Sequence, residues 1–186
     1  MIYSFEIALI RKAHDFYERG EYLSALNVYH RMIQMNPDLT QAWSGKGLAL
    51  LELKDYHKSI YCYQQVLKQD PQNAGAWNNS AVCYSELGFI KAAIRRYKKA
   101  IELQVEQKSL VSHAFLNLVE TYQELGRVQD ALLVADQWIR LDPKCLEAYE
   151  VRNDLLNEGK LPGVARLRTR TGFEWKELFR SSFPGQ

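Results

Sequence analysis

The sequence predicts an all-α solenoid in which antiparallel helix pairs stack side by side. Three observations support this fold class: an internal repeat of about 34 residues, an apolar stripe of helical period in each unit, and glycine at the expected end of three first helices. The first helices should begin at residues 6, 40, 74, 112 and 146, at equal intervals except for a longer one between the third and fourth units. One such unit cannot bury its own apolar face, so the units must stack.

Proline marks the end of three units, and tryptophan recurs near the start of two. Pro37 and Pro71 are one repeat apart, as are Trp43 and Trp77, and Pro143 ends the fourth unit. We number positions from the first residue of each unit. At about 100° per residue, positions 4, 7, 8 and 11 of a first helix share one face, which should pack against the second helix of the same unit.

Small residues occupy two further places in the repeat. Position 3 is alanine in every unit, which should let neighbouring helices approach closely. These alanines are Ala8, Ala42, Ala76, Ala114 and Ala148. Gly20, Gly88 and Gly126 fall where a first helix should end, and glycine there tolerates the left-handed conformation of a helix C-cap. The second unit has Lys54 instead, so we expect its turn to be strained or differently shaped.

This pattern resembles the tetratricopeptide repeat family, whose signature is Trp-x2-Leu-Gly-x2-Tyr, then Ala-x3-Phe, then Pro. The matching residues are Ala13, Phe16, Ala25, Tyr29 and Pro37 in the first unit, Trp43, Gly47, Tyr63 and Pro71 in the second, Trp77, Ala81, Tyr84, Ala93 and Tyr97 in the third, and Phe115, Leu118, Tyr122, Ala131 and Pro143 in the fourth. Ser59, Val105 and Ala135 depart from the signature. The resemblance implies a right-handed superhelix that binds another protein and is not an enzyme.

The repeat also predicts the organisation of the chain. The expected parts are a repeat domain over 6–158, with repeats at about 6–39, 40–73, 74–111 and 112–145 and a capping helix over 146–158, and a tail over 159–186. In the capping helix Arg152, Asn153 and Asp154 replace apolar residues, as a terminal unit requires.

The first helices should line the concave surface of the array, where a peptide or helix of a partner protein would bind. By angular arithmetic, positions 2, 5, 9, 12 and 13 lie opposite the packing stripe, with position 6 at the edge. The candidate groove residues are Ile10, His14, Tyr17, Glu18, Gln41, Ser44, Leu48, Glu52, Asn78, Asn79, Val82, Glu86, His113, Asn117, Glu120 and Glu124.

Two features of this candidate groove each have two interpretations. Position 13 is glutamate in all four repeats, either as a solvated charge paired with a nearby cation or as an acidic rail that favours basic segments. Asn79 and Asn117 stand at position 6. They either hold the backbone of an extended peptide, as the asparagine ladder of some tetratricopeptide proteins does, or are satisfied by a neighbouring helix.

Several more specialised functions are disfavoured. The clamp by which some co-chaperones hold a C-terminal carboxylate needs paired cations that neither possible register supplies. The sequence has no phosphate-binding loop, zinc-protease motif or nucleophile elbow, so we expect no catalysis and no cofactor or metal. Small secretion chaperones of similar length resemble the chain only at the level of the repeat. An adaptor, scaffold or assembly chaperone is the broader prediction.

The tail combines basic and aromatic residues. Residues 160–186 contain six basic and two acidic side chains, a balance of +4. Its candidate contact residues are Arg166, Arg168, Arg170, Phe173, Trp175 and Phe179. The tail either folds back onto the solenoid, its own or that of a second copy, or binds another macromolecule, or is a simple solubilising end. A tail in the groove would compete with a partner.

The overall charge weighs against a dedicated nucleic-acid binder, because 24 basic and 22 acidic residues give a net charge of only +2. The alternative function, nucleic-acid association, would use the basic tail and a convex cluster. This cluster contains Lys91, Arg95, Arg96, Lys98 and Lys99. The N-terminal residues lack the pattern of a signal peptide, and the three cysteines read as free thiols, so we expect a cytoplasmic protein without a membrane span.

Overall fold

The computed structural model describes residues 2–107 and 112–157, and these residues form an array of α-helices without strands. The helices are α1 (Ile2–Glu18), α2 (Tyr22–Met35), α3 (Thr40–Glu52), α4 (Tyr56–Gln69), α5 (Ala74–Glu86), α6 (Ile90–Glu106), α7 (Ser112–Glu124), α8 (Val128–Leu141) and α9 (Leu146–Asn157). The predicted starts of α3, α5, α7 and α9 are confirmed. The start predicted at Glu6 is wrong, because α1 begins at Ile2.

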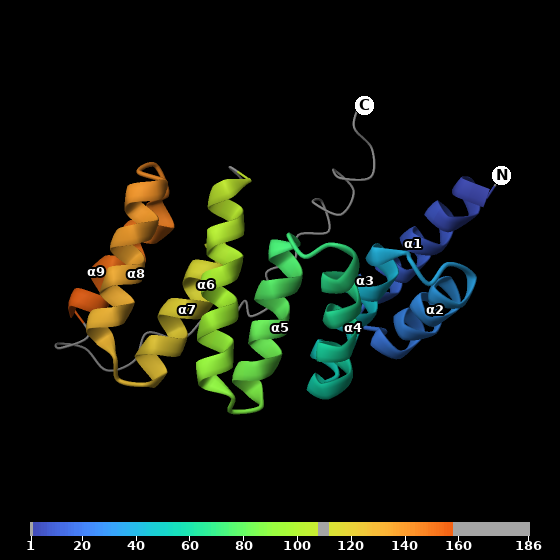
Figure 1. Ribbon diagram of the computed structural model, residues 1–186, viewed down its shortest axis with the longest axis horizontal. Helices are drawn as coiled ribbons and strands as arrows, with labels where there is room; N and C mark the ends of the chain where they lie inside the picture. The colour runs from blue at the N-terminus through green and yellow to red at the C-terminus, as the bar shows by residue number, and fades with distance from the viewer. Residues whose placement is uncertain (1, 108–111, 158–186) are drawn as a thin grey trace.

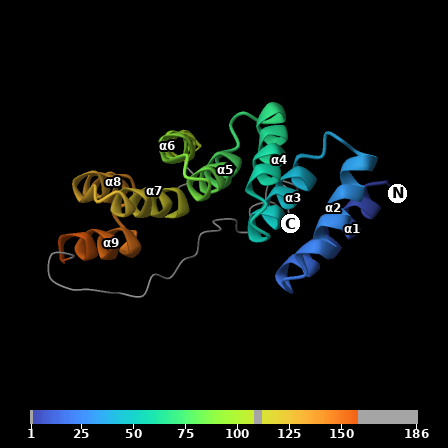
Figure 2. The same ribbon diagram turned by 90° about the horizontal axis from the view of Figure 1, so that it is seen from below.

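The helix pairs follow one another in chain order along an elongated, superhelical array (Figure 1). In Figure 2, α5 lies below α6, and α7 and α9 lie below α8, in the C-terminal half of the array. Successive odd-numbered helices from α1 to α7 contact one another more extensively than successive even-numbered helices do, so the odd-numbered layer is the inner, concave side. The predicted all-α solenoid is confirmed.

All four turns within the pairs have one geometry. Gly20, Gly88 and Gly126 have positive φ values of 72°, 80° and 67°, and Lys54 has a φ of 60°. In each turn the next amide donates to the carbonyl five residues earlier, as Asp55 does to Leu50 at 2.9 Å. This bond belongs to the Schellman motif that ends many helices. The chain therefore makes the same turn with lysine as with glycine, and Lys54 carries the strain that the sequence predicted.

The recurrent tryptophans and prolines have a shared structural role. The indole nitrogen of Trp43 donates to the Pro37 carbonyl at 2.7 Å, and Trp77 donates to Pro71 at 2.9 Å. Each tryptophan thereby anchors the start of a first helix to the turn that precedes it. Because the bond joins residues six apart, it recurs wherever the sequence repeats the two residues at that spacing.

Position 3 acts between repeats and not within them. Ala42, Ala76, Ala114 and Ala148 are buried, whereas Ala8 is exposed. The prediction of close helix approach at all five alanines is therefore wrong for Ala8. No repeat precedes the first one among the described residues, so nothing packs against this side of α1.

The interval between the third and fourth repeats is longer than the others, and its cause is visible in α6. Val105 stands where the other repeats have proline, so the helix continues to Glu106. The side chain of Gln107 then donates to the Gln72 carbonyl at 2.8 Å, tying the end of α6 to the preceding turn. On the outer layer, a cavity of about 530 Å³ lies between α6 and α8 and is lined by Val105, Leu133 and Leu141 among others.

Candidate partner-binding groove

The concave faces of α5 and α7 meet around a small depression. Its lining contains three carboxylates among polar and apolar neighbours, and its volume is about 10 Å³, room for roughly one water. The lining residues are Val82, Ser85, Glu86, Tyr97, Asn117, Glu120, Thr121 and Glu124. Five candidate groove residues from two repeats are thus brought together here: Val82, Glu86, Asn117, Glu120 and Glu124.

The asparagines form a hydrogen-bonded chain across two repeats. Asn117 Nδ2 donates to Asn78 Oδ1 at 3.1 Å, and Asn78 Nδ2 donates to Asn79 Oδ1 at 3.1 Å. All three side chains are buried, and Asn79 is only 1 % exposed. Of the two interpretations of Asn79 and Asn117, the structure favours satisfaction by neighbouring side chains. A peptide could bind to these asparagines only by displacing the hydrogen bonds between them. The prediction of an asparagine ladder did not include these bonds.

Two of the position-13 glutamates accept hydrogen bonds from tyrosines of the preceding repeat. Tyr17 Oη donates to Glu52 Oε1 at 3.0 Å, and Tyr56 Oη donates to Glu86 Oε2 at 3.0 Å. Burial, and to a smaller degree the Glu52 carboxylate, raises the pKa of Tyr17 well above that of a free tyrosine. Neither interpretation of these glutamates foresaw a tyrosine partner. Nothing in the sequence marked Tyr56, the first residue of α4, as a hydrogen-bond partner of a glutamate.

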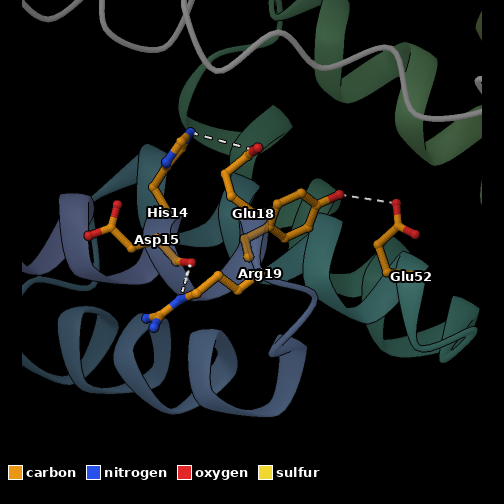
Figure 3. Close-up of polar contacts among 6 residues, drawn as sticks. His14, Asp15, Glu18, Arg19 and Glu52 are labelled. Carbon is orange, nitrogen blue, oxygen red and sulfur yellow. Dashed lines mark hydrogen bonds and ion pairs between the residues drawn. The ribbon is translucent and has the colours of Figure 1, made fainter.

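The N-terminal end of the groove carries a histidine and a carboxylate on one helix face. His14 Nε2 lies 3.7 Å from Glu18 Oε1, one turn away, and Figure 3 shows this pair beside the hydrogen bond to Glu52. Arg19 points to the other side and donates to the Asp15 carbonyl at 3.0 Å (Figure 3). His14 and Glu18 therefore lie on the side of α1 opposite Arg19 (Figure 3).

The remaining candidate residues are less accessible than the angular arithmetic suggests. Leu48 is 2 % exposed, and Ser44 is also buried, whereas Gln41 and His113 are half-buried. Ile10 is partly buried and packs against the core. The sequence assigned these residues to the groove by position alone, and position cannot report how far the neighbouring helix covers them.

Comparison with known families decides what kind of protein this is. A sequence model described as "Psidin, N-terminal TPR repeats region" matches residues 9–135, more than half of the chain. The chain belongs to this tetratricopeptide repeat family. The sequence resemblance is thus confirmed, and such repeat proteins are in general modules for protein–protein interaction. A search of curated protein sequences found no significant match.

Solved structures show the same tetratricopeptide fold. TTC0263, a protein of Thermus thermophilus, is 18 % identical and superposes with a TM-score of 0.69 over 81 % of each chain. PilF of Pseudomonas aeruginosa is also 18 % identical, with a TM-score of 0.69 over 83 % of this chain and 68 % of its own. MamA is 19 % identical, with a TM-score of 0.64 over 80 % and 84 % of the two chains. At these identities the likeness establishes the fold alone.

The convex basic cluster of this tetratricopeptide array is partly engaged in the fold. The Arg96 guanidinium lies 4.4 Å from the Tyr84 ring centroid and 5.2 Å from that of Trp77, and it donates to Ser80 Oγ. Lys99 pairs with Glu102 at 3.0 Å. These two cations therefore have structural partners, which leaves a smaller convex surface for phosphates than the sequence suggested.

The tetratricopeptide repeats bury two of the three cysteines. Burial raises the pKa of the Cys62 and Cys83 thiols to about 11.

Within residues 2–107 and 112–157, no cluster of three or more His, Cys, Asp or Glu side chains is arranged to hold a metal ion. None of the described helices combines the length and apolarity needed to cross a bilayer. The candidate tail contacts lie outside the described residues; they are Arg166, Arg168, Arg170, Phe173, Trp175 and Phe179.

Proposed function

We propose that this protein is a non-catalytic adaptor, scaffold or assembly chaperone of the cytoplasm that binds an extended, basic segment of a partner protein in its concave groove. A single observation carries the proposal: the concave positions 2, 5, 9, 12 and 13 of the described odd-numbered helices hold carboxylates but neither lysine nor arginine. The carboxylates are Glu18, Glu52, Glu86, Glu120, Glu124, Glu147, Glu150 and Asp154.

The charge asymmetry between the two layers supports this choice of partner. The chain as a whole is close to neutral, so the carboxylates are concentrated on one face and are not a property of the composition. A groove lined by charges of one sign raises the local concentration of ligands of the opposite sign and speeds their association. Acidic partners, nucleic acids included, are repelled by the same field.

The buried polar side chains beneath the carboxylates are engaged within the fold. Asn117 donates to Asn78, and the Thr121 hydroxyl donates to the Asn117 carbonyl. The charge-specific component of recognition therefore comes from the carboxylates, which favour lysine and arginine side chains of the partner.

Affinity capture from an extract of the native cells tests the proposal. We expect the Glu120→Lys/Glu124→Lys variant to lose the partners that the wild type retains. These two residues are chosen because both line the α5–α7 depression and lie one turn apart on α7. The matched control is Glu102→Lys/Glu106→Lys, which makes the same change one turn apart on outer helix α6.

Circular dichroism and the thermal midpoint show whether both variants remain folded. Loss of the same partners from both folded variants would mean that net charge, and not the groove, controls binding. Retention of every partner by the concave variant would contradict the proposal.

A further inference from the structure

The acidity of the concave face increases toward the C-terminal end of the solenoid. Helices α7 and α9 carry five of its eight carboxylates: Glu120, Glu124, Glu147, Glu150 and Asp154. Glu120 is half-buried and the other four are exposed. Their side chains continue the row of carboxylates begun at Glu18, Glu52 and Glu86, but at higher density. The strongest attraction for a cation therefore lies where the described chain ends.

The segment that leaves this acidic end is itself basic. Residues 160–186 have a balance of +4, and arginine alternates with other residues at Arg166, Arg168 and Arg170. In an extended backbone, alternate side chains point to the same side. An extended segment over 164–172 would therefore present three guanidinium groups to one surface, as a row of carboxylates requires.

The connection is long enough to allow this contact within one molecule. Helix α9 ends at Asn157, and the eight residues 158–165 span at most about 28 Å when extended. Helix α9 has 12 residues and a length of about 18 Å; α7 and α9 both pack against α8, and packed helices lie about 10 Å apart. The arginines can therefore return along the inner face of α9 and reach α7.

We propose that residues 164–172 bind in cis, as an extended basic segment, to the concave face of α7 and α9, where they act as an internal competitor of the partner. This inference rests on the proposed function, because it takes the groove to be the binding site. Attachment to α9 gives the tail a high effective concentration. Each exposed charge pair is individually weak and screened by salt. A partner that engages more of the groove can therefore displace the tail.

A photo-crosslinking experiment on the full chain tests where the tail lies. Val164, which lies on the same side of an extended segment as the three arginines, is replaced by p-benzoylphenylalanine, and the crosslinked peptides are identified by mass spectrometry. We expect crosslinks within a single chain to the concave residues of α7 and α9. Their yield should fall at least about fivefold in Arg166→Ser/Arg168→Ser/Arg170→Ser and between about 0.05 and 0.5 M NaCl, since both changes remove the charge pairing.

The variant Glu120→Lys/Glu150→Lys should lose the crosslink, and the outer-helix control Glu102→Lys/Glu106→Lys should keep it. Crosslinks to even-numbered helices, crosslinks found only between two chains, or a yield that is the same in all variants would overturn the proposal.

A competition experiment tests the regulatory consequence. A fluorescent synthetic peptide of residues 160–186 is titrated into the wild-type chain and into the variant Arg166→Ser/Arg168→Ser/Arg170→Ser. If the internal segment fills the groove about nine-tenths of the time, the peptide should bind the variant about tenfold more tightly. Equal affinity for the two proteins would overturn the competitor role.

The two proposals fail in different ways. Should crosslinking place the tail in the groove while partner capture is insensitive to Glu120→Lys/Glu124→Lys, the proposed function fails and the tail contact stands. Should capture depend on these glutamates while no concave crosslink forms, only the internal competitor is removed.

Discussion

At the scale of single residues, backbone conformation at four turns decides where each first helix ends. Three of the turns use glycine, which adopts a positive φ at no steric cost, and the fourth uses Lys54 at a φ of 60°. The same hydrogen bond, from the following amide to the carbonyl five residues earlier, forms in all four. The geometry is thus imposed by the packing of the pair, and lysine tolerates it at a cost in conformational energy.

Replacing Lys54 by glycine should therefore stabilise the protein. The left-handed conformation costs a non-glycine residue about 1 kcal/mol, and Lys54 is exposed, so little packing is lost with its side chain. We expect Lys54→Gly to raise the free energy of unfolding by about 0.5–1 kcal/mol, measured by urea denaturation. The reverse change, Gly88→Lys, should destabilise by a similar amount; no change in either variant would disprove the strain.

A second glycine is required for space and not for conformation. A Cβ atom on Gly45 would lie 2.6 Å from Tyr29 Oη and closer still to the ring of that tyrosine, which is buried in the core. We expect Gly45→Ala to destabilise the protein by about 2 kcal/mol, since overpacking outweighs the better helix propensity of alanine.

Urea denaturation measures this effect, and two comparisons identify its cause. Gly47→Ala should destabilise the protein less than Gly45→Ala, because a Cβ atom on Gly47 would lie 3.0 Å from the Tyr63 ring. In a Tyr29→Leu background the Gly45→Ala penalty should shrink. An unchanged penalty in that background would show that Tyr29 is not its source.

At the scale of elements, side-chain hydrogen bonds join each of the first three helix pairs to the next. Tyr17 and Tyr56 each donate a hydrogen bond to the position-13 glutamate of the following repeat, and the asparagine chain links α5 to α7. Glutamate near a helix C-terminus opposes the helix dipole, so local helix stability disfavours it. The hydrogen bonds from tyrosines of the preceding repeat explain the glutamates at Glu52 and Glu86, because they join one repeat to the next.

The bond between Tyr56 and Glu86 should contribute measurably to stability. Tyr56→Phe removes one hydroxyl that donates to a partly buried carboxylate at 3.0 Å, and we expect the free energy of unfolding to fall by about 1 kcal/mol. Thermal and urea unfolding measure the change. Tyr61→Phe, at an exposed tyrosine of the same helix, is the matched control and should be neutral. Equal stability of the two variants would leave Glu86 without this structural role.

At the scale of the whole molecule, the stacked repeats build one continuous core that holds several tyrosines. Burial is the main cause that raises the pKa of Tyr17, Tyr29, Tyr63 and Tyr97 above that of a free tyrosine. The unfolded chain releases these protons near pH 10, whereas the folded chain keeps them to higher pH. Stability is therefore fully present below about pH 10 and decreases as the pH rises further.

Alkaline unfolding should accordingly be steep and coupled to tyrosine ionisation. We expect the free energy of unfolding to fall continuously from about pH 10 upward, with the tyrosinate absorbance of the buried tyrosines appearing together with the loss of helical circular dichroism. Tyr97→Phe removes one of the coupled groups and should make the slope shallower. A stability that stays constant between about pH 9 and 11 would contradict the coupling.

The sequence by itself determined the features that depend on neighbours along the chain. The starts of α3, α5, α7 and α9, the three glycine turns and the strain at Lys54 follow from patterns among near neighbours, because helix periodicity and capping are local. Val105, which replaces the proline of the other repeats, likewise accounts for the longer α6. The family and the fold class were predictable for the same reason, since every unit repeats these local signals.

Only the tertiary structure decided what the concave side chains contact. The burial of Asn79, the tyrosine partners of Glu52 and Glu86, the exposure of Ala8, and the meeting of Glu86 with Glu120 and Glu124 all join residues from different repeats or depend on whether a neighbouring repeat is present. A residue's position within its repeat predicts which face it occupies. The distance to the next helix is set by the stacking of whole repeats, and that distance determines which side chains meet.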